Sequence, residues 1–111
     1  MRINDVERFA LLMIFHGDDS VSVAVRNQLE ELVVLSRSGT GVGFLSTMKL
    51  AAPLPDSNIH QRDWNFEHRQ LSHGGSFMCW TNNPGSLDLE GVVHYGEWPH
   101  NFDASDFREI V

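Results

Sequence analysis

The chain of 111 residues changes its pattern once, near residue 32, and this change limits the folds open to it. Before that point, apolar residues recur at the spacing of three and four that helices show. After it, short apolar stretches are separated by glycine, proline and asparagine, as in strands joined by turns. Helices followed by strands favour an α+β fold over alternating β-α-β units. We predict one α+β domain over residues 1–111, with two N-terminal helices packed on an antiparallel sheet of four or five strands.

The first predicted helix has sequence signals at both ends. Asn4 and Glu7 are three residues apart, as in a capping box, in which each side chain accepts a hydrogen bond from the other residue's amide. Gly17 stands where a left-handed C-terminal cap is expected. The apolar residues between these signals face more than one side of the helix: Val6, Phe9, Ala10, Leu12, Met13 and Ile14. Such a helix packs on two sides, either within the domain or against a second subunit.

The second predicted helix begins after Asp19 or Ser20, either of which can act as its N-cap. Its apolar residues recur at helical spacing, with polar residues between them: Val21, Val25, Leu29 and Leu32. Residues 21–25, V-S-V-A-V, also fit the alternation of a strand. The polar residues 26–31 favour the helix.

Five segments after this point have strand character: residues 32–37, 42–50, 64–69, 76–81 and 87–95. The third of them is predicted to be a short edge strand. The last two form the clearest hairpin, in which Pro84 and Gly85 fit the central positions of a type II turn within a loop longer than two residues. The register of this hairpin stays open, and with it the sheet face that Cys79 and Trp80 occupy. Residues 51–63 form an irregular connection, and the tail holds at most one helical turn after Asp103.

The charge of the chain excludes several classes of partner. Fifteen acidic residues against eight basic ones give a net charge of −7. Nucleic-acid binding requires a cluster of Lys and Arg, which the sequence lacks, and an acidic surface is repelled by anionic lipids. The longest apolar run, residues 9–15, is far shorter than a membrane-spanning helix. We therefore expect no nucleic-acid and no membrane partner, and the single cysteine suits a cytoplasmic protein.

No stretch of the sequence matches a catalytic or metal-binding motif. The glycines of G-T-G-V-G, residues 39–43, fit a turn between strands better than a nucleotide-binding loop. The six histidines are scattered, although His68, His73 and Glu97 could converge on a metal from separate loops. The stretch H-G-G-S-F-M-C-W, residues 73–80, reads as a turn entering a strand in which Cys79 packs as a small apolar residue; the alternative pairs Cys79 with His94 as a base. We predict no catalytic residue, no metal and no cofactor.

Residues 89–100 have the most unusual local composition, because carboxylates, imidazole and aromatic rings lie close together there. A ligand pocket in this region would use Glu90, His94, Tyr95, Glu97 and Trp98, with Trp80 as a wall. The favoured alternative is that Trp98 and Pro99 close the open end of the core where the chain leaves the sheet. The two interpretations predict different effects of removing the Trp98 side chain.

Three stretches carry a family resemblance: G-V-G-F-L-S-T, H-G-G-S-F-M-C-W and L-E-G-V-V-H-Y-G-E-W-P. They are similar to segments of small uncharacterised bacterial proteins, in which a helical N-terminus precedes an antiparallel sheet ending in a Glu-Gly…Tyr-Gly…Trp-Pro motif. The resemblance covers about the C-terminal two-thirds of the chain. It implies the same fold and a bacterial origin, and it assigns no activity to any residue.

These observations favour a small acidic interaction module without enzymatic activity. Its partner would be a protein or a second copy of the chain, because the first helix is apolar on more than one side. A toxin-neutralising protein is a specific version, since an acidic surface suits a basic nuclease. The alternative is a small-ligand binder or minor enzyme that uses the region from Glu90 to Trp98. In that case Glu90, Glu97 or a neutral His94 would act as the general base.

Overall fold

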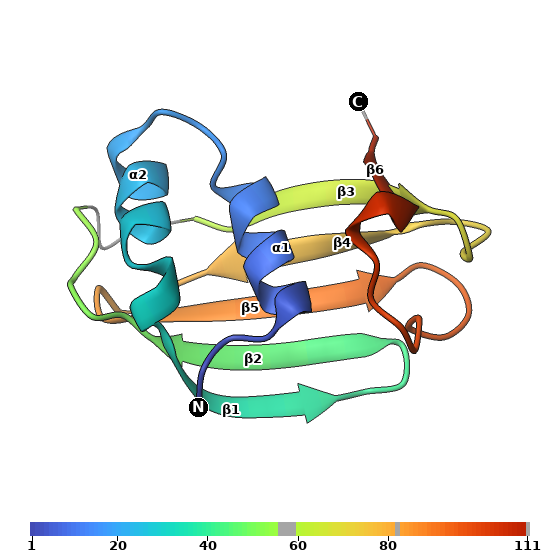
Figure 1. Ribbon diagram of the computed structural model, residues 1–111, viewed down its shortest axis with the longest axis horizontal. Coiled ribbons are helices and arrows are strands. Elements are labelled where there is room, and N and C mark those ends of the chain that lie inside the picture. Colours follow the sequence, from blue (N-terminus) through green and yellow to red (C-terminus); the bar gives the residue numbers. More distant parts are fainter. Residues whose placement is uncertain (56–59, 82, 111) are drawn as a thin grey trace.

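The computed structural model describes residues 1–55, 60–81 and 83–110, and it confirms the α+β class. Two helices lie on one face of a six-stranded antiparallel sheet whose order is β1-β2-β5-β4-β3-β6 (Figure 1). The helices are α1 (Asp5–Ile14) and α2 (Ser20–Asn27). The strands are β1 (Val33–Gly39), β2 (Gly43–Lys49), β3 (Arg62–His68), β4 (Gly75–Trp80), β5 (Ser86–Val93) and β6 (Phe107–Glu109). The sequence predicted four or five strands, and the sheet has six, the additional one being β6.

Helix α1 begins as predicted and ends differently. The side chain of Asn4 accepts a hydrogen bond from the Glu7 amide at 2.8 Å, and the Glu7 carboxylate accepts one from the Asn4 amide at 2.8 Å, which confirms the capping box. The prediction of a left-handed cap at Gly17 is wrong, because the helix ends at Ile14 and Gly17 has no positive φ. Beyond the helix end, the Arg26 guanidinium of α2 donates to the carbonyl of Gly17 at 2.6 Å, so a side chain from another helix satisfies this backbone oxygen.

Helix α2 is shorter than the predicted segment, and the strand alternative for residues 21–25 is wrong. Asp19 caps the helix by accepting a hydrogen bond from the Ser22 amide at 3.1 Å. After Asn27 the chain continues through a 3-10 turn, Leu29–Glu31. The four apolar residues predicted to face the core are all buried: Val21, Val25, Leu29 and Leu32.

The five predicted strands are present, with differences at the edges and in one turn. Strand β3 lies inside the sheet between β4 and β6, so its assignment as an edge strand is wrong. The short strand β6 follows a single 3-10 turn, Ala104–Asp106, at the place where one helical turn was predicted. Gly85 has no positive φ, which excludes the predicted type II turn. Asn82 in that loop, and residues 56–59 of the irregular connection, lie outside the described residues.

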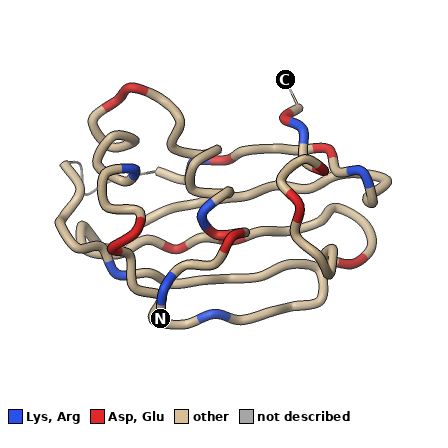
Figure 2. The backbone as a smooth tube through the Cα atoms, in the orientation of Figure 1, with Lys and Arg blue, Asp and Glu red and all other residues tan. Residues whose placement is uncertain are grey.

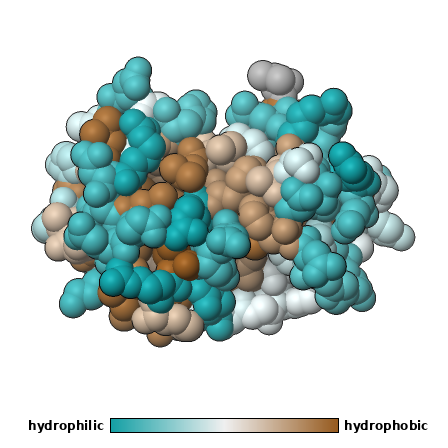
Figure 3. Space-filling model, viewed as in Figure 1, coloured by the Kyte–Doolittle hydropathy of each residue, from teal (hydrophilic) through white to brown (hydrophobic). Residues whose placement is uncertain are grey.

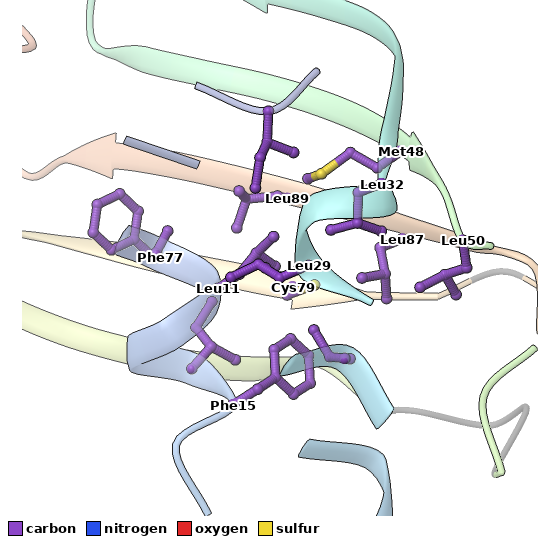
Figure 4. Close-up of a cluster of buried hydrophobic side chains, with 14 of the residues drawn as sticks. Leu11, Phe15, Leu29, Leu32, Met48, Leu50, Phe77, Cys79, Leu87 and Leu89 are labelled. Carbon is purple, nitrogen blue, oxygen red and sulfur yellow. The ribbon is translucent and has the colours of Figure 1, made fainter. Parts of the chain in front are cut away.

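The core lies between the helices and the sheet (Figure 4). Because side chains alternate along a strand, each inner strand places every second residue in this layer, including Leu87 and Leu89 of β5 and Phe77 of β4. Cys79 shares this face and is fully buried, as predicted for a packing residue. Helix α1 buries Leu11, and the half-buried apolar residues of α1 pack against the same core: Val6, Phe9, Leu12 and Met13. Both apolar sides of the helix are therefore used within the domain.

Candidate binding surfaces

The structure does not bring the predicted site residues together. Trp80 and Glu90 point to the face of the sheet opposite the helices, because their strand neighbours Cys79 and Leu89 are buried under the helices. Tyr95 and Glu97 lie exposed in the loop after β5, while His94, also exposed, lies on the side of Trp80 and Glu90, with its Nε2 at 3.3 Å from Ser76 Oγ. Trp98 lies on the helix side. The six residues therefore occupy three different surfaces of the molecule.

The sheet face opposite the helices, here called the helix-free face, combines apolar and acidic side chains. In β4, Met78 and Trp80 are half-buried on this face. The register places Met78 between Glu90 of β5 and Asp63 of β3, and it places Trp80 beside Asp88. Asp88 also accepts a hydrogen bond from the Thr47 hydroxyl at 2.8 Å, which fixes that carboxylate on the sheet surface. Two large apolar side chains thus lie among three carboxylates.

Trp98 packs over the sheet on the helix side, at the end where the β1–β2 turn lies. Its ring contacts Phe44 edge-on with a centroid distance of 5.3 Å, and it also contacts Phe66 and Phe77. Gly91 lies beneath this contact, and a Cβ there would come within 2.5 Å of Phe44 and 2.9 Å of Trp98. The Trp98 amide donates to the carbonyl of Gly41 at 2.9 Å, which anchors the C-terminal segment to the turn. The half-buried ring covers this end of the core.

A hollow of about 270 Å³ opens beside Trp98. Its walls come from the start of α1, from β1 and β2 and from the C-terminal segment: Asn4, Val6, Arg37, Gly39, Gly43, Phe44 and Trp98. Figure 3 shows a hydrophobic area in the middle of this side of the molecule, between α1 and the C-terminal segment. The hollow combines apolar walls with one guanidinium, which is a common composition for small-ligand sites.

An ion pair between the buried carboxylate of Glu7 and the partly exposed guanidinium of Arg37 links α1 to the sheet. The Glu7 side chain is 1% exposed, and Arg37 of β1 binds it with two hydrogen bonds, at 2.9 Å from Nε and 2.7 Å from Nη2. The Ser46 hydroxyl of β2 donates to the same carboxylate at 2.6 Å. Burial alone would raise the pKa of Glu7, but the hydrogen bonds from Arg37, Ser46 and the Asn4 amide outweigh it and hold the pKa below the ordinary value of 4.5.

The lowered pKa of Glu7 predicts a loss of stability in acid. Its contribution to the free energy of unfolding is fully present above the ordinary carboxyl pKa and is lost as the pH falls through the lower folded-state value. We expect urea midpoints measured between pH 6 and pH 2, about the range in which carboxyl groups titrate, to fall more steeply for the wild type than for Glu7→Gln. Equal slopes for the two proteins would show that Glu7 is not the titrating group. All other carboxylates are present in both the wild type and Glu7→Gln, so their contributions to the pH dependence cancel in the comparison.

The alternatives that used cysteine or histidine are not supported by the geometry of the described residues. Cys79 faces the helices, whereas His94 accompanies Ser76 on the opposite side, with 3.3 Å between Ser76 Oγ and His94 Nε2. Burial raises the pKa of the Cys79 thiol, which disfavours a reactive thiolate. His68 is buried, which lowers its pKa, and its Nδ1 accepts a hydrogen bond from the Gln70 amide at 3.0 Å. Among residues 1–55, 60–81 and 83–110, no three potential metal ligands gather.

Sequence reasoning missed two parts of these surfaces. Asp63 and Asp88 join Met78 and Trp80 of β4 on the helix-free face only through the register of β3, β4 and β5. The sequence also did not single out Arg37, although the carboxylate of Glu7, between the apolar residues Val6 and Phe9, needs a cation or hydrogen-bond donors if it is buried. No helix in the described part of the chain is long and apolar enough to cross a bilayer.

Comparisons with protein-family models, with curated protein sequences and with solved structures found no significant match to this chain. The resemblance to small bacterial proteins therefore stays a prediction.

Proposed function

We propose that the protein is a non-enzymatic interaction module that binds a basic protein partner through the helix-free face. The observation that carries the proposal is Trp80, a half-buried tryptophan on a sheet face without helices, with Asp88 as its direct cross-strand neighbour. Tryptophan is enriched among the residues that contribute most to binding energy at protein interfaces. Tryptophan has only two rotatable side-chain bonds, so little side-chain entropy is lost on binding.

The charges on this face favour a cationic partner. Asp63, Asp88 and Glu90 surround Met78 and Trp80, so these three carboxylates outnumber the one basic residue of β2 on this face, Lys49, which lies diagonally across from Asp88. The whole chain carries −7, so its long-range field attracts basic proteins and repels acidic ones. A protein that neutralises a basic toxic nuclease is a specific form of this proposal. In that role, the acidic face would cover the cationic groups with which the nuclease binds its substrate.

The test uses a panel of purified basic proteins, including ribonucleases and deoxyribonucleases, with binding measured by biolayer interferometry at several salt concentrations. We expect at least one of them to bind the wild type, with affinity that falls as salt rises. Glu90→Lys should weaken this binding at least about tenfold. Its matched control is Glu31→Lys, which reverses an exposed acidic residue on the helix side and should leave binding within about twofold.

Two outcomes would contradict the proposal. Equal losses in Glu90→Lys and Glu31→Lys would mean that the partner senses only net charge. Absence of binding across the whole panel would remove the basic partner. In either case, circular dichroism should first show that both variants are folded.

A second function, small-ligand binding, is favoured by the hollow beside Trp98. Phe44 and Trp98 form aromatic walls, and within the described part of the chain the Arg37 Nη1 group has only the sulfur of Met1, at 3.3 Å, as its hydrogen-bond partner. A carboxylate oxygen is a much better acceptor than a thioether sulfur. The hollow therefore suits a small planar ligand that carries a carboxylate.

Gly39 offers a direct test of this second function. It lines the hollow beside Phe44, and a Cβ built on it has nothing within 4 Å. Gly39→Val should therefore fill part of the hollow without strain. Benzoate and phenylacetate serve as probes in a thermal-shift assay, because a ligand at about 100 times its dissociation constant adds about 2.7 kcal/mol of stability. We expect a shift for the wild type that Gly39→Val abolishes, and an equal shift in both proteins would place the ligand elsewhere.

A further inference from the structure

Strand β1 forms one outer edge of the sheet and is poorly protected against pairing. Its outer side is engaged at Val34, whose amide donates to the Met1 carbonyl at 2.7 Å, and no further strand of the described residues lies beside it. Natural proteins protect such edges with very short strands, charged side chains, proline, β-bulges or a covering segment. Strand β1 is seven residues long and has one charged residue, Arg37, which turns inward to Glu7.

The opposite edge shows the contrast. Strand β6 has three residues, and two of them, Arg108 and Glu109, are charged and exposed. That edge has the protection that β1 lacks. In β1 the protection is confined to the start of the strand, where the Met1 contact and the β-bulge between Val34 and Ser36 lie, and residues 36–39 include no proline.

Exposed apolar side chains concentrate on the hairpin of β1 and β2. Leu35 is 59% exposed and Val42 is 47% exposed, and both Val33 and Leu45 are 39% exposed. Among the described residues, only eight large apolar side chains are exposed, and these four are half of them. Hydrophobic side chains in such a cluster gain free energy when a partner covers them.

The charge distribution indicates which partner fits. Residues 33–49, which span both strands and the turn, contain no Asp or Glu in a chain whose net charge is −7. Figure 2 shows this hairpin without acidic residues. Two copies of an acidic chain repel each other least where this hairpin meets its own copy. An antiparallel strand is also complementary to itself about a twofold axis, because each copy offers the same donors and acceptors to the other.

We infer that a second copy of the chain pairs with the first through the β1 edge, so that the two sheets join in a symmetric dimer. The β1 edge borders the basic-partner site, because Leu45 of β2 is the cross-strand neighbour of Glu90, but pairing at the edge does not depend on that site. Notably, the apolar α1 takes no part, since its side chains already pack within the domain.

Sedimentation velocity over a wide concentration range tests the inference. We expect the wild type to reach the mass of two 12.6 kDa chains. Leu35→Lys places a charge on the exposed edge and should raise the dimer dissociation constant at least about tenfold. Its matched control is Ile110→Lys, which changes an apolar residue that is 48% exposed next to β6 and should leave the constant unchanged. Leu35 is exposed, so thermal unfolding should confirm that the variant is folded.

Amide hydrogen exchange gives an independent readout, because pairing should protect β1 amides more at high protein concentration than at low. A wild type that stays monomeric at the highest concentration would overturn the inference. So would a Leu35→Lys protein that dimerises as the wild type does, or a dimer that only Ile110→Lys disrupts. None of these results bears on binding to basic proteins, which the Glu90→Lys variant tests.

Discussion

Replacing Arg37 with methionine is expected to lower the free energy of unfolding by about 3 kcal/mol or more. The aliphatic part of Arg37 is retained in methionine, but its two hydrogen bonds to the buried Glu7 carboxylate are lost. A carboxylate that is 1% exposed cannot recover its hydration, and only the Ser46 hydroxyl and the Asn4 amide remain as donors. Urea denaturation at neutral pH measures the loss directly.

Two further variants test whether the loss in Arg37→Met comes from leaving the Glu7 charge buried and unpaired, and not simply from removing an ion pair. Arg8→Met removes a guanidinium that binds Glu30 on the surface at 2.8 Å, and such exposed pairs contribute little to stability because water screens them, so this variant should stay close to the wild type. The double variant Arg37→Met with Glu7→Leu should recover much of the stability lost by Arg37→Met alone, because apolar pairs often replace buried ion pairs without a net loss. If Arg37→Met were as stable as Arg8→Met, Glu7 would have to be hydrated in solution.

The sequence was sufficient for those parts of the fold that depend on local signals. The capping box of Asn4 and Glu7 needs only residues three apart, and the polar stretch of residues 26–31 favoured a helix over a strand for residues 21–25. Gly17 failed as a cap because the helix ends earlier, at Ile14, and a distant residue, Arg26, donates to the carbonyl of its C-cap Phe15. Strand β6 was missed because three residues are too few to show an alternation, and this strand exists only through its pairing with β3.

The candidate surfaces were predictable only as far as strand alternation reaches. Alternation along one strand implies that Met78 and Trp80 share a face, but the register between β4 and β5 is needed to place Glu90 and Asp88 beside them. Trp98 lies beyond the last residue of β5, where alternation no longer applies. The chain reverses there at Gly96, with a φ of 95°, and carries Trp98 back over the helix side of the sheet. Glu90 and Trp98 therefore lie on opposite sides of the sheet although they are close in sequence.

Replacing Trp98 with alanine is expected to lower the free energy of unfolding by about 3 kcal/mol, the lower end of the range for large aromatic residues because the ring is half-buried. The ring contacts Phe44, Phe66 and Phe77 and covers Gly91, so its removal exposes this end of the core to water. Gly91 cannot fill the space. A loss of this size is a large fraction of the stability of a small domain.

Trp80→Ala is the matched control, because it removes the same side chain from the helix-free face. Trp80 does not contribute to the core between helices and sheet, so its removal should cost about 1 kcal/mol or less. Urea midpoints should therefore separate the two variants clearly, while binding to a basic protein should be lost only in Trp80→Ala. An unchanged midpoint in Trp98→Ala would mean that this ring does not hold the core closed. The hollow beside it would then become the better explanation for an exposed tryptophan at this position.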